Sequence, residues 1–530
     1  MPEPLAPFAT RHSTTAMVSS IDHLATEAGL GALRDGGSAA DGAIAANAVL
    51  AVTMPNLCGM GGDLFALVSQ DERPPATLNA AGRAGAGADS ARVRAEGFTQ
   101  MPFRHDIRAV TVPGCVDGWV ALHERFGRLP LERVLAPAIG YAHDGFPASS
   151  MLAASIATLP DVPGSEDLRG PTGNRKTGEV IRRPGVARAL RAIVADGRSG
   201  FYEGEFGAGL LAVGSGEYAP CDLEQPGARW VDPISVEAFG HLLWGVPPSS
   251  QGYLLLSSAW IADGLALPTD PDDPQWAHLL VEASKQAGYD RPAELHDRAD
   301  GSALVAPARL APRRDAIDSV RASALAGPAR AGDTTALCVV DGDGVGVSLI
   351  QSNASGFGSH LFEPSTGINL HNRGLGFSVE AGHPAEYAPG RQPPHTLTPA
   401  LVTGLDGRLA AVLATMGGDS QPQILLQVLA RALGAGESPA RAIAAGRFRL
   451  VAKQQTTGFA IWTDPAGTAV AVEGHAPERW PSGLAERGHE VLVEAPFDHG
   501  FGHAHLVLAQ DGVLAGAADP RARSSLCSGL

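Results

Sequence analysis

The chain has 530 residues, of which 44% are hydrophobic and 18% charged, a balance that suits a folded, loop-rich enzyme and excludes a disordered chain. Its formal net charge of −16 argues against binding to nucleic acid or to an anionic membrane, because both would need a basic face. The first twenty residues lack a basic start followed by an apolar stretch, so we expect no signal peptide or membrane anchor and a cytoplasmic location.

The five cysteines are far apart and odd in number, without the paired spacing of a metal site. We expect each of them to be a buried, inert thiol. The cysteines therefore predict neither a paired-cysteine metal site nor a catalytic thiol.

Two helices are predicted near the N-terminus. Apolar residues recur at helical spacing over residues 21–33, and Gly36-Gly37 supplies a C-terminal stop. Ser38 with Asp41 forms an N-terminal capping pattern, and the helix that follows is apolar nearly all round, which indicates burial. Residues 56–68 then read as a glycine-rich turn that enters an apolar strand.

The middle of the chain is predicted to be scaffold. Helical patches cover residues 119–125, 131–142 and 186–195, with proline-rich connections between them. Residues 322–333 are small and polar without a sustained apolar period, so they are expected to be exposed and flexible.

From residue 334 the pattern changes to strands. Two β-branched-rich runs flank the Asp341–Gly344 turn sequence and predict a hairpin. Further strands are expected at 400–403 and 409–414, and an apolar helix at 421–433. A sheet core covered by helices follows, in which Thr334 opens the first strand.

Eight segments stand out along the chain, in the order MVSSIDHLATEAGLGALRDGGSAADGAIAANAVLAV, CGMGGDLF, VPGCVDGWVALHERFG, GVPPSSQG, AGDTTALCVVDGDGVGVSLIQS, GSHLFEPSTGINLHN, ATMGGDSQPQ and GAADPR. Together they resemble the γ-glutamyltransferase family of N-terminal-nucleophile hydrolases. The similarity covers nearly the whole chain. Agreement of many motifs in order is far more specific than any one of them.

This resemblance implies a fold and a processing event. The expected fold is α+β, a four-layer αββα sandwich built jointly by two subunits. The precursor would cut itself between Asp333 and Thr334, giving a large subunit of residues 1–333 and a small subunit of residues 334–530. The expected assembly is an αβ heterodimer, or a pair of such heterodimers.

The resemblance also implies catalytic roles. Thr334 matches the family nucleophile; a threonine hydroxyl needs a base, and the new α-amine, with an ordinary pKa of about 8, can serve as one. Ser352 matches a hydroxyl residue that assists the nucleophile. Gly417 and Gly418 match the oxyanion hole, where backbone N–H groups at a helix start favour negative charge. No cofactor or metal is expected.

The chain departs from the family where glutamate is recognised. Gly376 stands at the position of the acidic residue that grips the donor α-amino group, and Ala354 stands where an asparagine is expected, with Asn353 beside it. Arg83 is displaced by two positions from the family arginine that clamps the α-carboxylate. The candidate substrate-binding residues are therefore Arg83, Asn353, Arg373, His395 and Thr396.

These changes predict hydrolysis of a small-molecule amide whose acyl part carries a carboxylate, through a threonyl acyl-enzyme. The alternatives are a γ-glutamyl hydrolase or transferase acting on glutathione or similar compounds, and an unprocessed, non-catalytic homologue. A metalloenzyme is a third alternative, suggested by His499, His503 and His505, although a solvated loop and strand edge explain that histidine pattern more simply.

Overall fold

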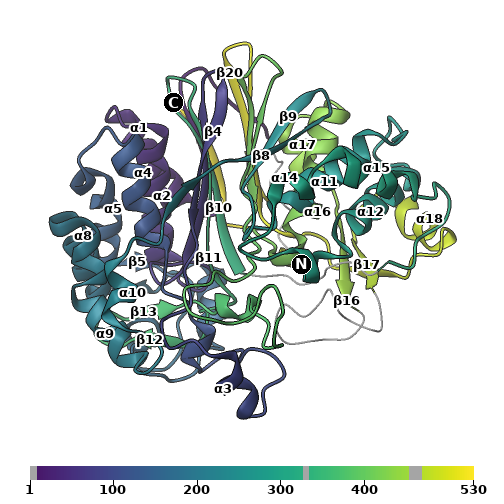
Figure 1. Ribbon diagram of the computed structural model, residues 1–530. Coiled ribbons are helices and arrows are strands. Elements are labelled where there is room, and N and C mark those ends of the chain that lie inside the picture. Colours follow the sequence, from purple (N-terminus) through teal and green to yellow (C-terminus); the bar gives the residue numbers. More distant parts are fainter. Residues whose placement is uncertain (1–8, 326–332, 453–467) are drawn as a thin grey trace.

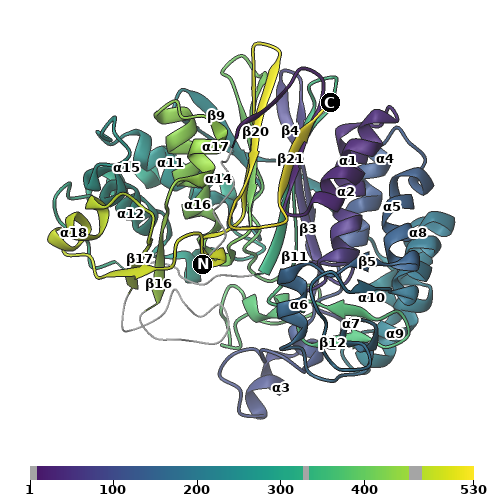
Figure 2. The same cartoon turned by 180° about the vertical axis from the view of Figure 1, so that it is seen from behind.

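A computed structural model describes residues 9–325, 333–452 and 468–530. Two seven-stranded sheets lie face to face, and helices cover the outer face of each sheet (Figures 1 and 2). This is the predicted four-layer αββα sandwich. Part of the segment expected to be flexible, residues 326–332, lies outside the described residues.

One sheet contains the strand that begins at the predicted cleavage point. Its strands in spatial order are β21 (Leu526–Gly529), β2 (Met17–Ser20), β10 (Asp333–Val340), β11 (Gly346–Ala354), β3 (Asp63–Gln70), β4 (Arg73–Ala80) and β7 (Arg229–Val231). The predicted hairpin is β10–β11, which lies at the centre of this sheet.

The second sheet is also antiparallel. Its strands in spatial order are β1 (Arg11–Ser13), β20 (Val513–Ala518), β19 (Ala504–Gln510), β15 (Leu409–Thr415), β14 (Ala400–Thr403), β9 (His241–Gly245) and β8 (Ile234–Ala238). Each sheet thus mixes strands from before and after residue 334. The two parts of the chain therefore share one folded unit.

Two helical layers enclose the sheets. The layer beside β10 contains α1 (His23–Arg34), α2 (Ala39–Thr53), α4 (Cys115–Phe126), α5 (Leu131–Asp144) and α8 (Pro184–Tyr202). The other layer contains α11 (Gly252–Asp263), α12 (Pro274–Gly288), α15 (Pro307–Asp315), α16 (Gln421–Leu429), α17 (Pro439–Ala444) and α18 (Arg479–Glu486). The helix predicted over 421–433 is thus α16 followed by a π-turn at Ala430–Gly434.

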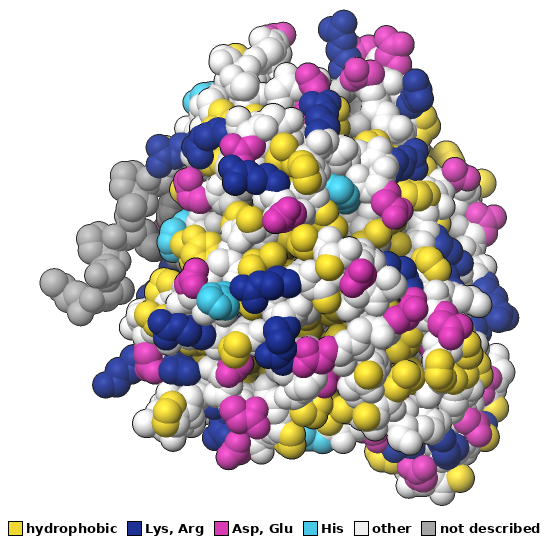
Figure 3. All heavy atoms as spheres, turned by 90° about the vertical axis from the view of Figure 1, so that its left-hand side faces the viewer, with side chains coloured by type: hydrophobic (Ala, Val, Ile, Leu, Met, Phe, Trp, Pro, Cys, Tyr) yellow, Lys and Arg dark blue, Asp and Glu magenta, His cyan; other side chains and the backbone are white. Residues whose placement is uncertain are grey.

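Smaller elements complete the fold. A three-stranded sheet of β16 (Phe448–Ala452), β17 (Thr468–Glu473) and β18 (Val491–Glu494) lies beside the second helical layer, and β12 (Leu361–Glu363) pairs with β13 (Ile368–Leu370). On the outer face of the first helical layer, acidic and basic side chains are interspersed (Figure 3). No helix among the described residues is long and apolar enough to cross a bilayer.

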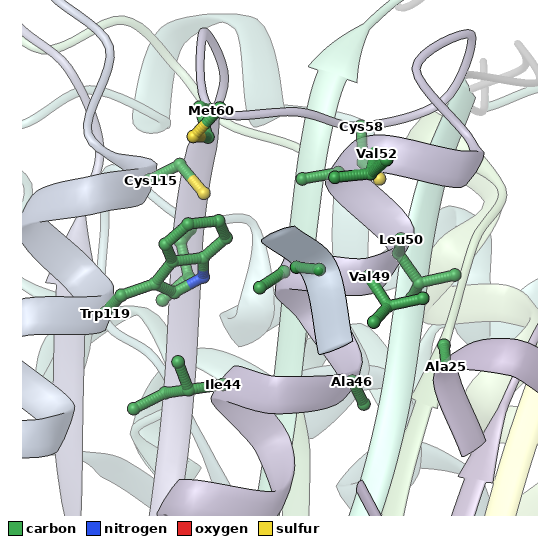
Figure 4. Packing of buried hydrophobic residues seen from close by; sticks show 14 of the residues in the cluster. Ala25, Ile44, Ala46, Val49, Leu50, Val52, Cys58, Met60, Cys115 and Trp119 are labelled. Atoms are coloured by element: carbon green, nitrogen blue, oxygen red, sulfur yellow. The ribbon is translucent and has the colours of Figure 1, made fainter. Parts of the chain in front are cut away.

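Helix α2 is buried on all sides, as its sequence predicts. Ser38 and Asp41 form the expected capping box. Ile44, Val49 and Leu50 pack in the cluster that also holds Trp119 of α4 (Figure 4). The helix carries one buried amide, Asn47, whose Oδ1 accepts a 2.8 Å hydrogen bond from the Trp119 indole N–H. The Trp119 ring therefore satisfies the amide oxygen of Asn47, whereas the Asn47 amide nitrogen has no hydrogen-bond partner among the described residues.

Asn47→Leu is expected to destabilise the protein, because it leaves the buried Trp119 N–H without its acceptor at a cost of about 1–3 kcal/mol. The measurement is the midpoint of denaturant unfolding. Asn174→Leu, at an exposed position, is the matched control. An unchanged midpoint for Asn47→Leu would show that the Asn47–Trp119 hydrogen bond contributes nothing to stability.

Candidate active site

Thr334 lies at an irregularity in the central hairpin. Asp333 pairs with Ala354 and Thr335 pairs with Gln351, so Thr334 alone faces two residues of β11, Ser352 and Asn353. Such a bulge twists the strands and re-aims a side chain. Thr334 is 1% exposed, which places its hydroxyl inside the protein.

The structure brings Thr334 and Ser352 together. The Thr334 hydroxyl donates to Ser352 Oγ at 3.0 Å. The same oxygen accepts a hydrogen bond from the Ala354 amide at 2.8 Å and one from Arg373 Nη2 at 3.2 Å. Ser352 thus presents an acceptor to the threonine hydroxyl. Ala354 has φ 73°, a conformation that the asparagine expected from the family would tolerate more easily.

Arg373 is a fully buried cation, and the Ser352 hydroxyl bridges its guanidinium to the Thr334 hydroxyl. It opens the 3₁₀ turn Arg373–Gly376 and also donates from Nη1 to Thr396 Oγ1 at 2.9 Å. Burial lowers the pKa of Arg373 to about 10, and the carboxylates of Asp63 and Asp419 oppose that shift. Even so, the guanidinium keeps its charge at neutral pH.

Asp63 is the carboxylate with the largest electrostatic effect on Arg373. Its Oδ2 lies 3.1 Å from His395 Nε2 and 3.6 Å from His371 Nδ1, and its Oδ1 accepts from the amides of Gly82 and Gly114. Burial raises the pKa of Asp63, but His371, His395 and Arg373 outweigh that effect and hold it below its ordinary value. A buried carboxylate therefore stays ionised beside Arg373.

The structure does not support His395 as a direct carboxylate anchor. Its Nε2 faces Asp63, and its Nδ1 accepts from the Leu397 amide at 3.5 Å. Burial and the nearby Arg373 lower the pKa of His395 to about 3, so the ring is neutral. His395 instead links Asp63 to the segment that carries Thr396.

The two predicted oxyanion-hole glycines lie at the start of the turn before α16. Gly417 has φ 146° and Gly418 has φ 55°, both in the region that favours glycine. The amide N–H groups of these buried glycines have no acceptor among residues 9–325, 333–452 and 468–530. Buried amides without an acceptor are rare, so two in succession suit the binding of a transient anion.

Residues from the N-terminal part of the chain hold this glycine turn in place. Gln251, just before α11, donates to the carbonyls of Thr396 (2.9 Å) and Gly418 (3.0 Å). Arg291, in the short helix α13 (Arg291–Glu294), forms a buried 3.0 Å ion pair with Asp419. Because both ties cross the predicted cleavage point, the glycine turn would stay oriented after processing.

Arg83 lies outside this group of residues. It is half-buried and lines a separate pocket of about 190 Å³. The other lining residues are Gly82, Ala84, Val112, Asp117, Cys221, Asp222, Gln225, Gly227 and Gly390. Its assignment as a substrate anchor is therefore not supported.

Cys221, which lines the same pocket, also departs from expectation. Cys221 is exposed, whereas the other four cysteines are buried as predicted.

Asn353 has a scaffolding position. Its amide nitrogen donates to the carbonyls of Pro55 and Cys58 at 3.1 and 2.7 Å, and its backbone amide donates to Leu57. These bonds hold the turn that leads into β3. Substrate contact by Asn353, expected from the sequence, has no support in this geometry.

Five residues of the site were missed from sequence: Asp63, Gln251, Arg291, His371 and Asp419. Two of them had a signal, since Asp63 and Asp419 each follow a glycine pair in an apolar context where a carboxylate needs a partner. Their partners come from distant segments, and no local pattern could identify them.

The histidines proposed for a metal site do not converge. The His499 side chain is exposed, whereas His503 and His505 are fully buried, and β19 pairs on both sides, so the predicted solvated strand edge is wrong. Another group, His278, Glu282 and His489, is close enough to hold an ion within the described part of the chain. There His278 Nδ1 already hydrogen-bonds His489 Nε2, and Lys285 already pairs with Glu282. That group is therefore neutralised without an ion.

Comparison with known proteins identifies the family. Residues 25–528 match the Gamma-glutamyltranspeptidase family. The oxamate amidohydrolase proenzyme of Klebsiella pneumoniae is 36% identical, over 97% of this chain and 98% of its own. The glutathione hydrolase-like YwrD proenzyme of Bacillus subtilis is 33% identical, over 96% and 97%. The crystal structure of cephalosporin acylase from Bacillus halodurans superposes with a TM-score of 0.89 and 32% identity, covering 100% of this chain and 98% of that one.

Fold, motifs and relatives thus agree on a class, the autoprocessed amidohydrolases. The chain belongs to the gamma-glutamyltranspeptidase family. The resemblance seen in the sequence is confirmed.

Proposed function

We propose that the chain cuts itself between Asp333 and Thr334, and that Thr334 is then the nucleophile of an amidase for small carboxylate-bearing acyl groups. Residues 1–333 form the large subunit and residues 334–530 the small subunit of a heterodimer. The cytoplasmic location expected from the sequence is part of this proposal. One observation carries it: the hydroxyl of Thr334 and the buried cation of Arg373 meet at Ser352 Oγ.

The chemistry follows from these positions. In the precursor, Thr334 Oγ1 attacks the carbonyl of Asp333, and the peptide C–N bond breaks to free the α-amine and leave an ester; water then hydrolyses the ester to the Asp333 carboxylate and the free Thr334 hydroxyl. In the mature enzyme the α-amine takes the hydroxyl proton while Oγ1 attacks the substrate carbonyl. The oxyanion faces the Gly417 and Gly418 amides, the proton passes to the leaving amine as the C–N bond breaks, and water hydrolyses the acyl-threonine.

The position of Arg373 favours a short acyl group. The two spacings through Ser352, 3.0 and 3.2 Å, put Arg373 Nη2 within about 6 Å of Thr334 Oγ1. An attack distance of about 3 Å and a charged hydrogen bond of about 2.8 Å use most of that span. The path through the acyl group is therefore bent even for a carboxyl bonded directly to the scissile carbonyl, and each further methylene requires the acyl chain to fold back more.

The relatives support the same substrate class. The relative from Klebsiella pneumoniae is named for oxamate, in which the carboxylate adjoins the amide carbonyl. The relative from Bacillus subtilis is named glutathione hydrolase-like, which keeps γ-glutamyl compounds as the rival substrates. Gly376, at the place of the family's acidic grip on the donor amine, weighs against that rival.

A chain-length series tests this proposal. Processed enzyme is assayed with oxamate, malonamate, succinamate and glutaramate, and with a γ-glutamyl anilide in the presence and absence of a dipeptide acceptor. We expect kcat/KM to be highest for oxamate and to fall at least about tenfold by glutaramate, because each methylene moves the carboxylate about 1.3 Å farther from the carbonyl. Efficient cleavage of the γ-glutamyl anilide with no turnover of the short amides would contradict the proposed substrate class.

A further inference from the structure

A fixed positive charge lies beside the group that becomes the α-amine. The amine belongs to the same residue as the Thr334 hydroxyl, and Arg373 reaches that hydroxyl through Ser352 alone. Burial lowers the pKa of Arg373 to about 10, which marks a cation that water screens poorly. Any positive charge formed on the amine would be repelled by this neighbour.

Two buried carboxylates lie near Thr334, and each opposes a buried arginine. Asp63 of β3 is the register partner of Ser352, and it faces Arg373 from the neighbouring strand. Asp419 of the glycine turn is paired with Arg291 of α13. His371 and His395 lie beside Asp63, and burial lowers both of their pKa values, so they are neutral.

Two further groups complete this environment. The Cys58 thiol, which contacts Thr335, has its pKa raised to about 12 by burial and stays protonated. The carboxylate that cleavage creates at Asp333 is common to every variant compared below. Arg373 is thus the cation with the most direct connection to the nucleophile.

We propose that Arg373 keeps the Thr334 α-amine unprotonated in the free enzyme, and that the substrate carboxylate, by pairing with Arg373, makes the amine more basic as it binds. The inference rests on the proposed function. A unit charge about 6 Å away shifts a pKa by about two units at an effective dielectric constant of about 20, and Asp63 offsets part of that. The pKa of the Thr334 α-amine is therefore expected to rise by about one unit when the substrate carboxylate binds.

This coupling would make the carboxylate part of catalysis as well as of binding. Before binding, the amine is neutral and ready to accept a proton. Once the carboxylate neutralises Arg373, the amine gains the basicity needed to take the proton from Oγ1. A neutral amide of similar size would leave the amine a weak base and lose kcat as well as affinity.

The test is the pH dependence of oxamate hydrolysis by the processed wild-type enzyme between pH 5.5 and 9. The acid limb of kcat/KM reports the pKa of the amine in the free enzyme, and that of kcat reports it in the enzyme–substrate complex. We expect the pKa from the kcat profile to be about one unit higher than the pKa from the kcat/KM profile. Coincident values, or the reverse order, would overturn the inference.

Charge variants give a second readout. In Arg373→Gln the kcat/KM acid limb is expected to move up by about one unit and the gap between the two profiles to close, whereas Arg373→Lys keeps the gap. The matched control is Arg133→Gln on α5, an exposed arginine in the outer helical layer. If Arg373→Gln fails to fold or to process, the gap between the two pKa values in the wild type and in Arg373→Lys still tests the inference.

Failure of this inference can be told apart from failure of the proposed function. Loss of oxamate turnover in the wild type, or turnover that survives without Thr334, would reject the proposed function itself. Thr334-dependent oxamate turnover with equal pKa values in the two profiles would reject only the coupling through Arg373.

Discussion

Thr334→Ala is expected to yield one uncut chain of 530 residues with amidase activity reduced at least about a thousandfold. The substitution removes the hydroxyl that donates to Ser352 Oγ, and with it the group needed both for cleavage and for acyl transfer. Intact mass and turnover of oxamate by the purified protein are the measurements. The wild type should split into pieces of 333 and 197 residues, the counts before and from Thr334.

Two neighbouring variants control this experiment. Thr334→Ser keeps a hydroxyl and should retain cleavage and part of the activity. Thr335→Ala removes the next hydroxyl, which donates to the Gln351 carbonyl instead, and should still be cut. N-terminal sequencing of the small fragment must begin Thr-Thr-Ala. Another start, or an active and uncut Thr334→Ala protein, would show that the nucleophile lies elsewhere.

Acid is expected to destabilise the protein steeply below pH 6.5. His395, His503 and His505 are fully buried, and burial lowers their pKa values to about 3, 3 and 4 from an ordinary 6.5. The folded state therefore prefers the neutral rings. Their contribution to stability is complete above pH 6.5 and is lost as the pH falls toward the folded values, at about 1.4 kcal/mol per pH unit for each ring.

The midpoint of denaturant unfolding between pH 7.5 and 4.5 measures this loss. His503→Leu is expected to make the decline shallower, since neither ring nitrogen of His503 has a partner among the described residues and the variant takes up one proton fewer. His499→Leu is the matched control because its ring is exposed. A midpoint that stays level from pH 7 to 5 would contradict the assignment of neutral buried histidines.

Local pattern was enough for much of the fold. The capping box at Ser38 and Asp41, the apolar surround of α2 and the β10–β11 hairpin are set by residues adjacent in sequence, and all three are present. The order of motifs identified the family, which then supplied the four-layer architecture. These features depend on short-range propensity and on periodicity.

The candidate site depends on long-range contacts and was predicted only in part. Sequence position matched Thr334 with Ser352, because a hairpin makes their spacing local. The partners of Arg373 come from other segments, and these decide whether a cation can remain charged inside the protein. Arg83 and His395 show the same limit. The pocket that Arg83 lines and the burial that keeps the His395 ring neutral both depend on residues distant in sequence.

The sequence alone thus determined the elements, the family and the residue at which the precursor is predicted to open. Tertiary structure alone decided which charges surround that residue. The physical reason is that helix and strand patterns arise from neighbours a few positions apart, whereas burial and ion pairing arise from segments that the two sheets bring together.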